Sequence, residues 1–453
     1  MVNLHDILTP ALRERYKDLG ETMCRHFGWE KAHQFQIDGT MLQLAGYDGI
    51  VHVATGRGKT AIVAGPYVYE ENLRKTTIMV CPLIALQEEM KVTFERKHGL
   101  SAIIINSGIG NGSTEILKEV VNNKYWIILI SPESLLSRRI IDVILRNSTF
   151  TKSVLSLVID EAHCVSFWSN SFRKKYGALH LVRQFLPRRT PVIALSATLT
   201  PRVRRDLVPK LNLSTDHVLI NEGNHKPNLT IAVLRCKYTL KSLHDLAFVI
   251  PDSTFHPFDI PKTLVYTDNI DTGRQIVQFL TSLLPDHLRN AGIIRPYNSR
   301  HTQEYRALAM QQLREDNIRV LVCTDAAGMG CDIPDIDVVV QWRITFLSAL
   351  IQCWGRAGRG PGRTGLGILL FEPSACKVDP TSPGESNRVA KSKPGNKRQQ
   401  RSALRKGGFQ SDAPGAEPEV HDDSPAEGTY AMVQTNGCVR HIWTKVFDNQ
   451  PIG

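Results

Sequence analysis

The sequence Gly49-Ile-Val-His-Val-Ala-Thr-Gly-Arg-Gly-Lys-Thr60 joins a short apolar run to a glycine-containing turn, and the segment Ala61 to Tyr69 that follows can be helical. The run from Gly49 to Val53 has the length and β-branched character of a buried strand. A strand, a glycine-rich turn and a helix in this order form an anion cradle, because backbone N–H groups and the helix N-terminus point toward the bound group. The stretch therefore predicts an α/β fold with a phosphate site at the end of a strand.

The turn supplies most of the expected nucleotide contacts, namely Thr55, Gly56, Arg57, Gly58, Lys59 and Thr60. Glycines allow the backbone to approach phosphate, Lys59 can reach the terminal phosphates, and the Thr60 hydroxyl can bind Mg²⁺. The generic motif has glycine where this chain has Val53. The alternative is that the two glycines only form a turn.

Further short apolar runs follow in two series. The first series is Thr77 to Cys81, Trp126 to Ile130, Val154 to Ile159 and Pro191 to Leu195. The second series is Thr263 to Tyr266, Arg319 to Cys323, Val338 to Gln341 and Gly367 to Phe371. Segments with helical spacing, such as Ile84 to Phe94, lie between them, and buried strands that alternate with helices indicate parallel sheets covered on both faces. The sequence therefore predicts two tandem α/β lobes joined near Glu222 to Asn228.

We expect five regions along the chain: an N-terminal helical segment over 1–24, a first lobe over 25–222, a second lobe over 223–376, a disordered linker over 377–429 and a short segment over 430–453. The linker is rich in Ser, Pro, Gly, Lys and Arg, and such a composition cannot bury enough apolar surface to fold. Apolar periodicity resumes from Tyr430 to Phe447.

The composition of the 453 residues favours an intracellular protein with a polyanionic partner. The formal charge of +11 and a pI near 9.2 suit nucleic acid, although part of this excess lies in the linker. Nine scattered cysteines without a Cys-x-x-Cys pair favour reduced thiols. The chain has no apolar run long enough to cross a membrane and no features of a secretory signal at its N-terminus, so no membrane partner is expected.

A second motif, Asp160-Glu-Ala-His163, directly follows the apolar run Val154 to Ile159. Doubly wound sheets bind ligands at the carboxyl ends of their strands, where these carboxylates are expected. Asp160 can hold Mg²⁺ directly or through water, and Glu161 can orient and deprotonate an attacking water. Together with Lys59, this motif predicts a site that hydrolyses a nucleoside triphosphate.

Helical spacing between Phe346 and Arg359 separates an apolar face from a face with Gln352, Arg356 and Arg359. Guanidinium groups aimed at a γ-phosphate stabilise the charge of the transition state, so both arginines are arginine-finger candidates. Two glycines weaken this helix, so its end is expected to be irregular. An exposed basic helix face is the alternative.

Two further polar segments follow buried strands. Thr324 to Asp332 brings Gly328, Gly330 and the nucleotide-contact candidate Asp332 near the expected cleft between the lobes, and Ser196-Ala-Thr198 brings two hydroxyls. We expect the first segment to sense nucleotide and nucleic acid together, and the second to link the phosphate site to the other lobe. Ordinary turn or cap residues are the alternative for both.

The motifs Gly58-Lys-Thr60, Asp160-Glu-Ala-His163, Ser196-Ala-Thr198 and Gln352-x-x-Gly-Arg-Ala-Gly-Arg359 occur in the order seen in superfamily 2 helicases. Residues 20–375 resemble RecQ helicases more narrowly, and the matching segments are Asp160 to Arg173, Phe27-Gly-Trp with Gln36, Pro82-Leu-x-x-Leu86, Ser131-Pro-Glu133 and Lys226-Pro-Asn-Leu229. The resemblance implies two RecA-like lobes, ATP and Mg²⁺ as cofactors, and unwinding of duplex DNA with 3′-to-5′ movement. It also implies that Gln36 reads the adenine and that His163 belongs to the catalytic set.

The aromatic loop after the Asp-Glu-Ala-His motif is the expected DNA contact. Trp168 and Phe172 can stack on bases, and Arg173 and Lys174 can bind phosphates beside them. Core packing is the alternative for Phe172.

The chain departs from the RecQ pattern in three places. Phe167, Asn170 and Ser171 replace the usual glutamine, histidine and aspartate of the aromatic loop, which is expected to alter the stimulation of hydrolysis by DNA. His33 replaces the usual arginine of the adenine-reading segment, which is expected to loosen base selectivity. The segment from Cys438 resembles the opening of a zinc-binding subdomain, but one cysteine cannot hold structural zinc. We therefore expect no zinc site, a truncated chain and no winged-helix module.

Two alternatives stay open. One is an RNA helicase with the same motor, and the other is a non-catalytic remnant that binds nucleic acid through Arg173 to Lys175 and the basic linker. The resemblance and the basic block Lys391 to Lys406 lead us to expect nuclear localisation, although the block could equally be a solvated linker.

Overall fold

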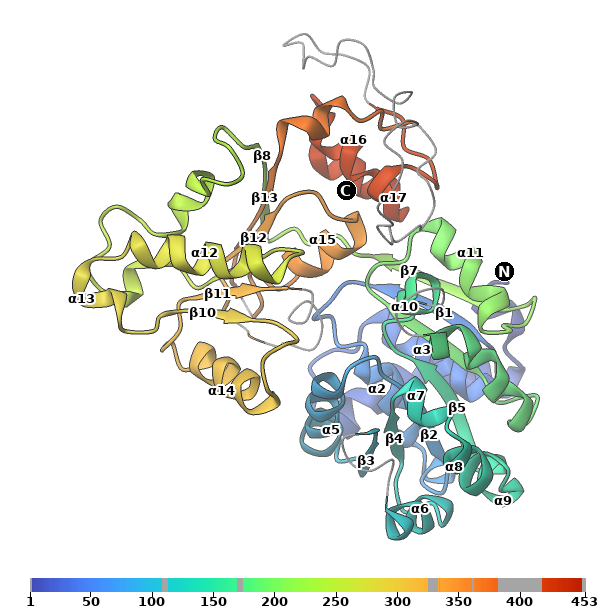
Figure 1. Ribbon diagram of the computed structural model, residues 1–453. Helices are drawn as coiled ribbons and strands as arrows, with labels where there is room; N and C mark the ends of the chain where they lie inside the picture. The colour runs from blue at the N-terminus through green and yellow to red at the C-terminus, as the bar shows by residue number, and fades with distance from the viewer. Residues whose placement is uncertain are drawn as a thin grey trace, which may run out of the picture. The chain divides into compact units, whose positions relative to one another are not determined.

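The computed structural model describes residues 2–107, 113–168, 174–324, 333, 335–360, 362–381 and 418–449 (Figure 1). The chain divides into two compact units, Met1–Asn224 and His225–Gly453. Each unit is built on one parallel β-sheet with helices packed against it, so the predicted pair of α/β lobes is confirmed. The boundary falls after residue 224, and the expected one was after residue 222.

The first unit contains a seven-stranded sheet in the order β3-β4-β2-β5-β6-β1-β7, with parallel pairing throughout. Its strands are β1 (Gly49–Val53), β2 (Thr76–Val80), β3 (Ala102–Ile105), β4 (Ile127–Ile130), β5 (Val154–Ile159), β6 (Val192–Ser196) and β7 (Val218–Gly223). Every residue of the five inner strands is buried, which explains their continuous apolar runs. Because β5, β6 and β1 are neighbours, their carboxyl ends lie side by side.

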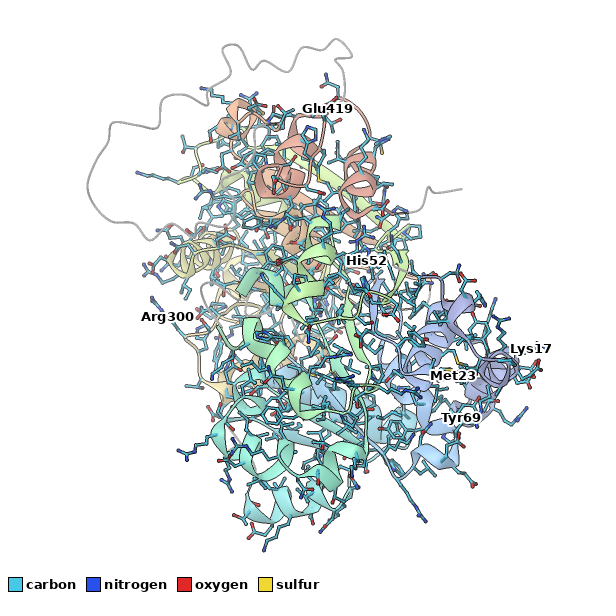
Figure 2. The ribbon with its side chains drawn as sticks, turned by 90° about the vertical axis from the view of Figure 1, so that its right-hand side faces the viewer. Lys17, Met23, His52, Tyr69, Arg300 and Glu419 are labelled. Carbon is cyan, nitrogen blue, oxygen red and sulfur yellow. The ribbon has the colours of Figure 1, made fainter. Side chains whose placement is uncertain are left out.

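The α-helices of the first unit are α1 (Leu4–Ile7), α2 (Pro10–Phe27), α3 (Gln34–Ala45), α4 (Thr60–Ala64), α5 (Ile84–His98), α6 (Thr114–Val121), α7 (Pro132–Leu135), α8 (Arg138–Ile140), α9 (Ser148–Lys152), α10 (His163–Trp168) and α11 (Pro201–Lys210). Local signals set the ends of α2: the Thr9 hydroxyl accepts the Leu12 N–H, and Gly28 ends the helix at a φ of 70°. Met23 of this helix is fully buried in the core, whereas Lys17 points to solvent (Figure 2). The helix expected over 1–24 is thus part of the first unit.

The helix expected over Ala61 to Tyr69 is shorter than predicted. It ends at Ala64, and a 3-10 turn over Gly65–Val68 follows. Pro66 has no N–H to donate to the next helical hydrogen bond, so the α-helix cannot continue regularly through it.

The second unit contains a six-stranded parallel sheet in the order β10-β11-β9-β12-β13-β8. Its strands are β8 (Leu229–Arg235), β9 (Thr263–Tyr266), β10 (Ile294–Tyr297), β11 (Val320–Cys323), β12 (Val338–Trp342) and β13 (Gly365–Phe371). Its α-helices are α12 (Ile270–Ser282), α13 (Asp286–Arg289), α14 (Gln303–Arg314), α15 (Leu347–Trp354), α16 (Thr429–Gln434) and α17 (Val439–Phe447).

Helices α16 and α17 belong to the core of the second unit. Met432, Trp443 and Phe447 are buried in one apolar cluster with Leu350 of α15, and α16 and α17 lie beside β13 and α15 in Figure 1. The expected linker over 377–429 ends earlier than predicted, because Pro425–Gly428 already form a 3-10 turn. Residues 382–417 lie outside the described residues. Among the helices that the structure describes, none is long and apolar enough to cross a membrane.

Candidate active site

The glycine-rich turn connects β1 to α4, as the sequence predicted. Gly56 and Gly58 have φ values of 76° and 78°, which is a left-handed conformation that favours glycine. The Lys59 ammonium donates to the carbonyl oxygens of Val53 and Ala54, at 3.2 Å each. The lysine side chain therefore folds back over the turn, in the space that a phosphate group would enter.

Gln36 on α3 is held against this turn. Its amide nitrogen donates to the Gly58 carbonyl at 3.1 Å, and its amide oxygen accepts the His33 N–H at 2.9 Å. The expected adenine-reading glutamine thus lies beside the phosphate-binding turn. Burial, and next the charge of Arg57, lower the pKa of His33, so this side chain is a weaker cation than the arginine it replaces.

Asp160 and Glu161 follow β5 in a turn that is tied to both neighbouring strands. The Asp160 N–H donates to the Val80 carbonyl, and the Ala162 N–H donates to the Leu195 carbonyl, at 2.9 Å each. Glu161 has a φ of 46°, a strained conformation for a residue with a side chain. Strain of this kind is found where the surrounding structure fixes a functional side chain in one direction.

The charges of Glu161 and Lys59 both affect the pKa of Asp160. Burial, and next the charge of Glu161, raise the pKa of Asp160, whereas the charge of Lys59 lowers it. Two adjacent desolvated carboxylates repel each other, and a divalent cation between them and a phosphate would relieve that repulsion. The residues present therefore fit Mg²⁺, with Asp160 and Thr60 as the groups that would hold it.

His163 connects this turn to the Ser-Ala-Thr segment at the end of β6. Its Nδ1 lies 2.8 Å from the Ser196 hydroxyl and 3.3 Å from a carboxylate oxygen of Glu161. The Ser196 hydroxyl also accepts the Thr198 N–H at 3.2 Å. Burial opposes a charged imidazole, but the contacts with Cys164 and Glu161 outweigh it and raise the pKa of His163.

A second group of side chains, which was not predicted from the sequence, holds the Ser-Ala-Thr segment. The Ala197 carbonyl oxygen lies 3.2 Å from His52 Nε2 and accepts from the Asn224 amide at 3.0 Å. The other ring nitrogen of His52 lies 2.8 Å from the Asn221 amide oxygen. A polar residue within an apolar strand such as β1 is the signal that could have identified His52.

In the second unit, the two candidate arginines do not share a helix face with Gln352. Helix α15 ends at Trp354, and Arg356 and Arg359 lie in the turn that follows. Gly355 begins this turn, and Gly358 within it adopts a φ of 60° that a helix does not allow. The prediction that all three polar residues lie on one helix face was therefore wrong, although the expected irregular end is present.

Other candidates fall outside the described residues. They are Phe172 and Arg173 with Asn170 and Ser171 of the aromatic loop, and Gly328, Gly330 and Asp332 of the Thr324 to Asp332 segment. The side chains of Trp168 and Lys174 also lie outside the described part. Cys438 is exposed at the N-terminus of α17, and the expected lack of a zinc site stays a prediction.

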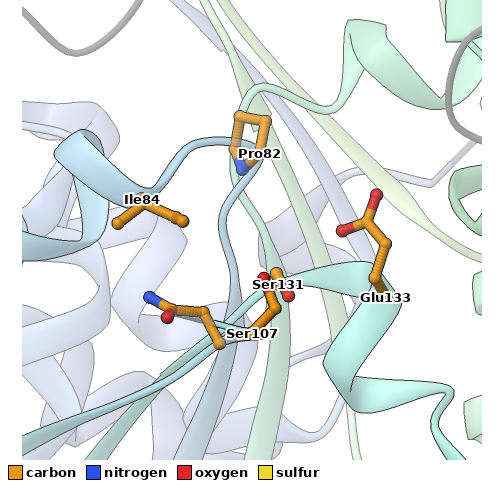
Figure 3. A pocket seen from close by; sticks show the side chains of 6 residues that line it. Pro82, Ile84, Ser107, Ser131 and Glu133 are labelled. Carbon is orange, nitrogen blue, oxygen red and sulfur yellow. The ribbon is translucent and has the colours of Figure 1, made fainter. Parts of the chain in front are cut away.

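A pocket of about 130 Å³ lies at the carboxyl ends of β2, β3 and β4 (Figure 3). It is lined by Pro82, Ile84, Asn106, Ser107, Ser131 and Glu133. Helix α5 begins beside it, and its first N–H groups receive no hydrogen bond from the side chain of the capping residue Leu83. The N–H groups of a helix N-terminus and hydroxyls suit the phosphates of a nucleic-acid backbone.

Comparisons with known proteins agree with this geometry. Residues 33–207 match the family model of DEAD/DEAH box helicases, and residues 253–361 match that of the helicase conserved C-terminal domain. The chain is 26% identical over 383 residues to the ATP-dependent DNA helicase RecQ of Pasteurella multocida, across 82% of this chain and 54% of that protein. This chain belongs to the RecQ-type helicases of superfamily 2. The predicted resemblance to that family is confirmed.

This RecQ-type chain is also 28% identical over 350 residues to a protein of Acanthamoeba polyphaga mimivirus that is named as an ATP-dependent RNA helicase. That match covers 77% of this chain and 60% of the viral protein, so the chain spans little more than half of these two relatives. Among solved structures, Saccharomyces cerevisiae Dbp5 bound to RNA and ADP BeF3 is similar with a TM-score of 0.57 and 17% identity, over 82% of this chain and 89% of that chain. The likeness identifies the two units as RecA-like lobes.

Proposed function

We propose that this chain is an ATP-dependent helicase that unwinds duplex DNA with 3′-to-5′ polarity. The observation that carries the proposal is the arrangement of Lys59, Asp160 and Glu161 at the carboxyl ends of β1 and β5, the two strands that flank β6. The two motifs therefore lie at the same edge of one parallel sheet, and the charge of Lys59 lowers the pKa of Asp160. Membership of the RecQ-type helicases supports the choice of ATP as the nucleotide.

In the proposed reaction, Lys59 exchanges its two carbonyl contacts for the β- and γ-phosphates of ATP. Thr60 and Asp160 would hold Mg²⁺, which would neutralise phosphate charge. Glu161 orients a water molecule and takes its proton as the water oxygen attacks the γ-phosphorus. The bond between the γ-phosphorus and the bridging oxygen breaks, and ADP leaves with that oxygen. Arg356 and Arg359 stabilise the charge that spreads over the transferred group.

Several features support nucleic acid as the second substrate. The pocket at β2, β3 and β4 combines hydroxyls with the N-terminus of α5, and the chain carries a charge of +11. DNA is proposed over RNA because the matched RecQ protein is named as a DNA helicase. The viral relative named as an RNA helicase makes RNA the second candidate.

One set of assays tests the proposal. ATP turnover of the full chain is measured with and without single-stranded DNA, followed by strand displacement on duplexes with a 3′ or a 5′ tail, in DNA and in RNA. We expect DNA-stimulated turnover and displacement of 3′-tailed DNA, and loss of both in Lys59→Ala. Lys152→Ala, at an exposed lysine on α9, is the matched control.

The assay outcomes separate the alternatives. A preference for the RNA duplex would replace DNA with RNA as the substrate. Turnover without displacement on any duplex would leave an ATPase that does not unwind, and DNA binding without turnover would identify the non-catalytic remnant. Undiminished turnover in Lys59→Ala would overturn the proposed site itself.

We also propose nuclear localisation, supported by the basic block Lys391 to Lys406. A fluorescently labelled chain should accumulate in nuclei of eukaryotic cells, and replacement of the lysines and arginines of the block by glutamine should abolish that accumulation. An even distribution of the unaltered chain would reject this proposal.

A further inference from the structure

Helix α15 is followed by the turn that contains Arg356 and Arg359, which we call the arginine turn. The helix is capped at its N-terminus by a residue far away in the sequence. The Glu427 carboxylate accepts the Ser348 N–H at 2.9 Å. The capping residue of the helix itself, Phe346, offers no side-chain acceptor. A carboxylate at this end satisfies a donor that lacks a partner within the helix, and its charge is favourable to the helix dipole.

The C-terminal end of α15 is held by a cation from another distant segment. The Lys226 ammonium donates to the Gly355 carbonyl at 3.2 Å and to the Ala357 carbonyl. Burial, and next the charges of Arg359 and Arg356, lower the pKa of Lys226 to about 8. This lysine therefore lies within electrostatic reach of both arginines, and it fixes the backbone on either side of Arg356.

Neighbouring side chains also bind the backbone of this turn. The Asn228 amide donates to the Gly358 carbonyl at 2.8 Å and to the Arg363 carbonyl at 2.7 Å. The Arg359 guanidinium donates to the Gly355 carbonyl at 3.1 Å. The backbone of the arginine turn is thus held at several carbonyls by the side chains of Lys226, Asn228 and Arg359.

The C-terminal segment of the chain contributes to both caps of α15, Glu427 and Lys226. Glu427 is 7% exposed, and its φ of 55° follows a φ of 49° at Ala426, so a strained turn directs the carboxylate to α15. Arg440 on α17 donates to the carbonyls of Lys226 and Leu229. Residues 424–447 therefore contain the N-terminal cap Glu427, and through Arg440 they also bind the backbone of the C-terminal cap Lys226.

We infer that Glu427 and Lys226 are positioning residues for Arg356 and Arg359 in ATP hydrolysis. Neither side chain touches the nucleotide in this scheme; together they set where the helix ends and how the arginine turn is oriented. The inference rests on the proposed function, because it requires that the arginines act in the transition state. It assigns a role in hydrolysis to a C-terminal segment that contains none of the helicase motifs.

The test compares steady-state ATP turnover of full-length variants. Glu427→Ala and Lys226→Met should lower kcat about tenfold while KM for ATP changes less than about twofold, because misplacement of a catalytic group slows the reaction without weakening contacts made by the first unit. Glu427→Gln keeps an acceptor and should lose about threefold, between wild type and alanine. Lys226→Arg should restore most of the rate. Glu419→Ala, at a side chain that is 81% exposed in the same segment (Figure 2), is the matched control.

A double variant tests whether Glu427 acts through Arg356. In single-turnover hydrolysis, which resolves slow rates, Glu427→Ala should cause clearly less than its full tenfold loss in an Arg356→Ala background, because only Arg359 is then left to be misplaced. Urea unfolding of each variant reports the folded fraction, to which kcat is normalised. A full additional loss in the Arg356→Ala background would overturn the inference, as would a wild-type kcat in both Glu427→Ala and Lys226→Met.

These outcomes also separate the inference from the proposed function. A wild-type rate in Arg356→Ala would reject the proposed role of the arginine itself. A slow Arg356→Ala variant combined with fast Glu427→Ala and Lys226→Met variants would reject the positioning role alone.

Discussion

His163 Nδ1 lies 2.8 Å from the Ser196 hydroxyl, so the last residue of the Asp-Glu-Ala-His motif contacts the first residue of the Ser-Ala-Thr segment. The same nitrogen lies 3.3 Å from the Glu161 carboxylate. The direction of the proposed base thus depends on a hydroxyl from the next strand. A displacement of the Ser-Ala-Thr segment would therefore move the His163 imidazole and change the orientation of Glu161.

Removal of that hydroxyl should slow hydrolysis more than it weakens ATP binding. We expect Ser196→Ala to lower kcat about tenfold and to change KM for ATP by less than about twofold, because Glu161 loses its orientation while Lys59 and Gln36 are untouched. The measurement is ATP turnover at saturating DNA. Ser153→Ala removes a hydroxyl that is hydrogen-bonded to Asn123 and Phe150 at 2.6 Å each and serves as the control. An equal loss in both variants would contradict the specific role of Ser196.

Acid should destabilise the first unit through His98. This residue is 8% exposed, packs edge-on to Phe27 and Trp29, and has an Nδ1 without a hydrogen-bond partner in the described part of the chain. Burial, and next the charge of Lys97, lower the pKa of His98 to about 4. The unfolded chain, with a pKa near 6.5, takes up the proton first as pH falls, so stability is complete above about pH 6.5 and is lost toward pH 4.

The loss should reach up to about 3 kcal/mol. Urea unfolding of wild type and His98→Phe at pH 7.5 and 5.0, followed by tryptophan fluorescence, measures it. The variant keeps the ring packing but cannot titrate, so its midpoint should depend less on pH. His26→Gln, at an exposed histidine of α2, should retain the wild-type dependence. If His98→Phe loses as much stability in acid as wild type, the effect has another source.

A methyl group at Gly358 should disrupt the arginine turn. Its Cβ would lie 2.7 Å from the Gly365 nitrogen and 2.8 Å from the Thr364 carbonyl carbon, and backbone atoms cannot move aside as a flexible side chain can. With a φ of 60° added, Gly358→Ala should cost about 3 kcal/mol of unfolding free energy in the second unit. Gly362→Ala has a similar φ of 69° but open space around it, so it should cost about 1 kcal/mol. Equal urea midpoints for the two variants would show that the close contact has no effect.

The strands that the sequence revealed and those that it did not differ in their position in the sheets. Every inner strand of both sheets was predicted, whereas the edge strands β3, β7, β8 and β10 were not. Inner strands are covered on both faces and need continuous apolar runs. Edge strands are covered less: β8 is buried only at Leu229, and β10 contains Pro296, which is tolerated at an edge.

In the candidate site, too, the residues set by local sequence patterns could be predicted, whereas contacts between segments distant in the sequence could not. The positions of Lys59, Asp160 and Glu161 could be predicted, because Lys59 ends the turn after β1, the two carboxylates follow β5, and parallel strands end at one edge. The bonds of His52 to the Ser-Ala-Thr segment and of Glu427 to α15 could not, because no local pattern identifies a partner that lies distant in the sequence. Helical periodicity placed Arg356 and Arg359 on a helix face, and it failed because Gly355 and Gly358 end the helix first.

The apolar periodicity from Tyr430 to Phe447 was assigned to the start of a zinc-binding subdomain and not to the second lobe, because periodicity identifies a buried face and not the core that it joins. Trp443 is 1% exposed within the cluster that includes Leu350 of α15. Trp443→Ala should therefore cost about 3–5 kcal/mol of unfolding free energy and lower ATP turnover in parallel, because the helix before the arginine turn packs on the same cluster. Thr444→Ala, at the next and only half-buried position of α17, should cost less than about 1 kcal/mol. Urea unfolding and ATP turnover measured on the same preparations decide the matter: if Trp443→Ala unfolds at the wild-type midpoint, the C-terminal helices are not needed for the stability of the second lobe.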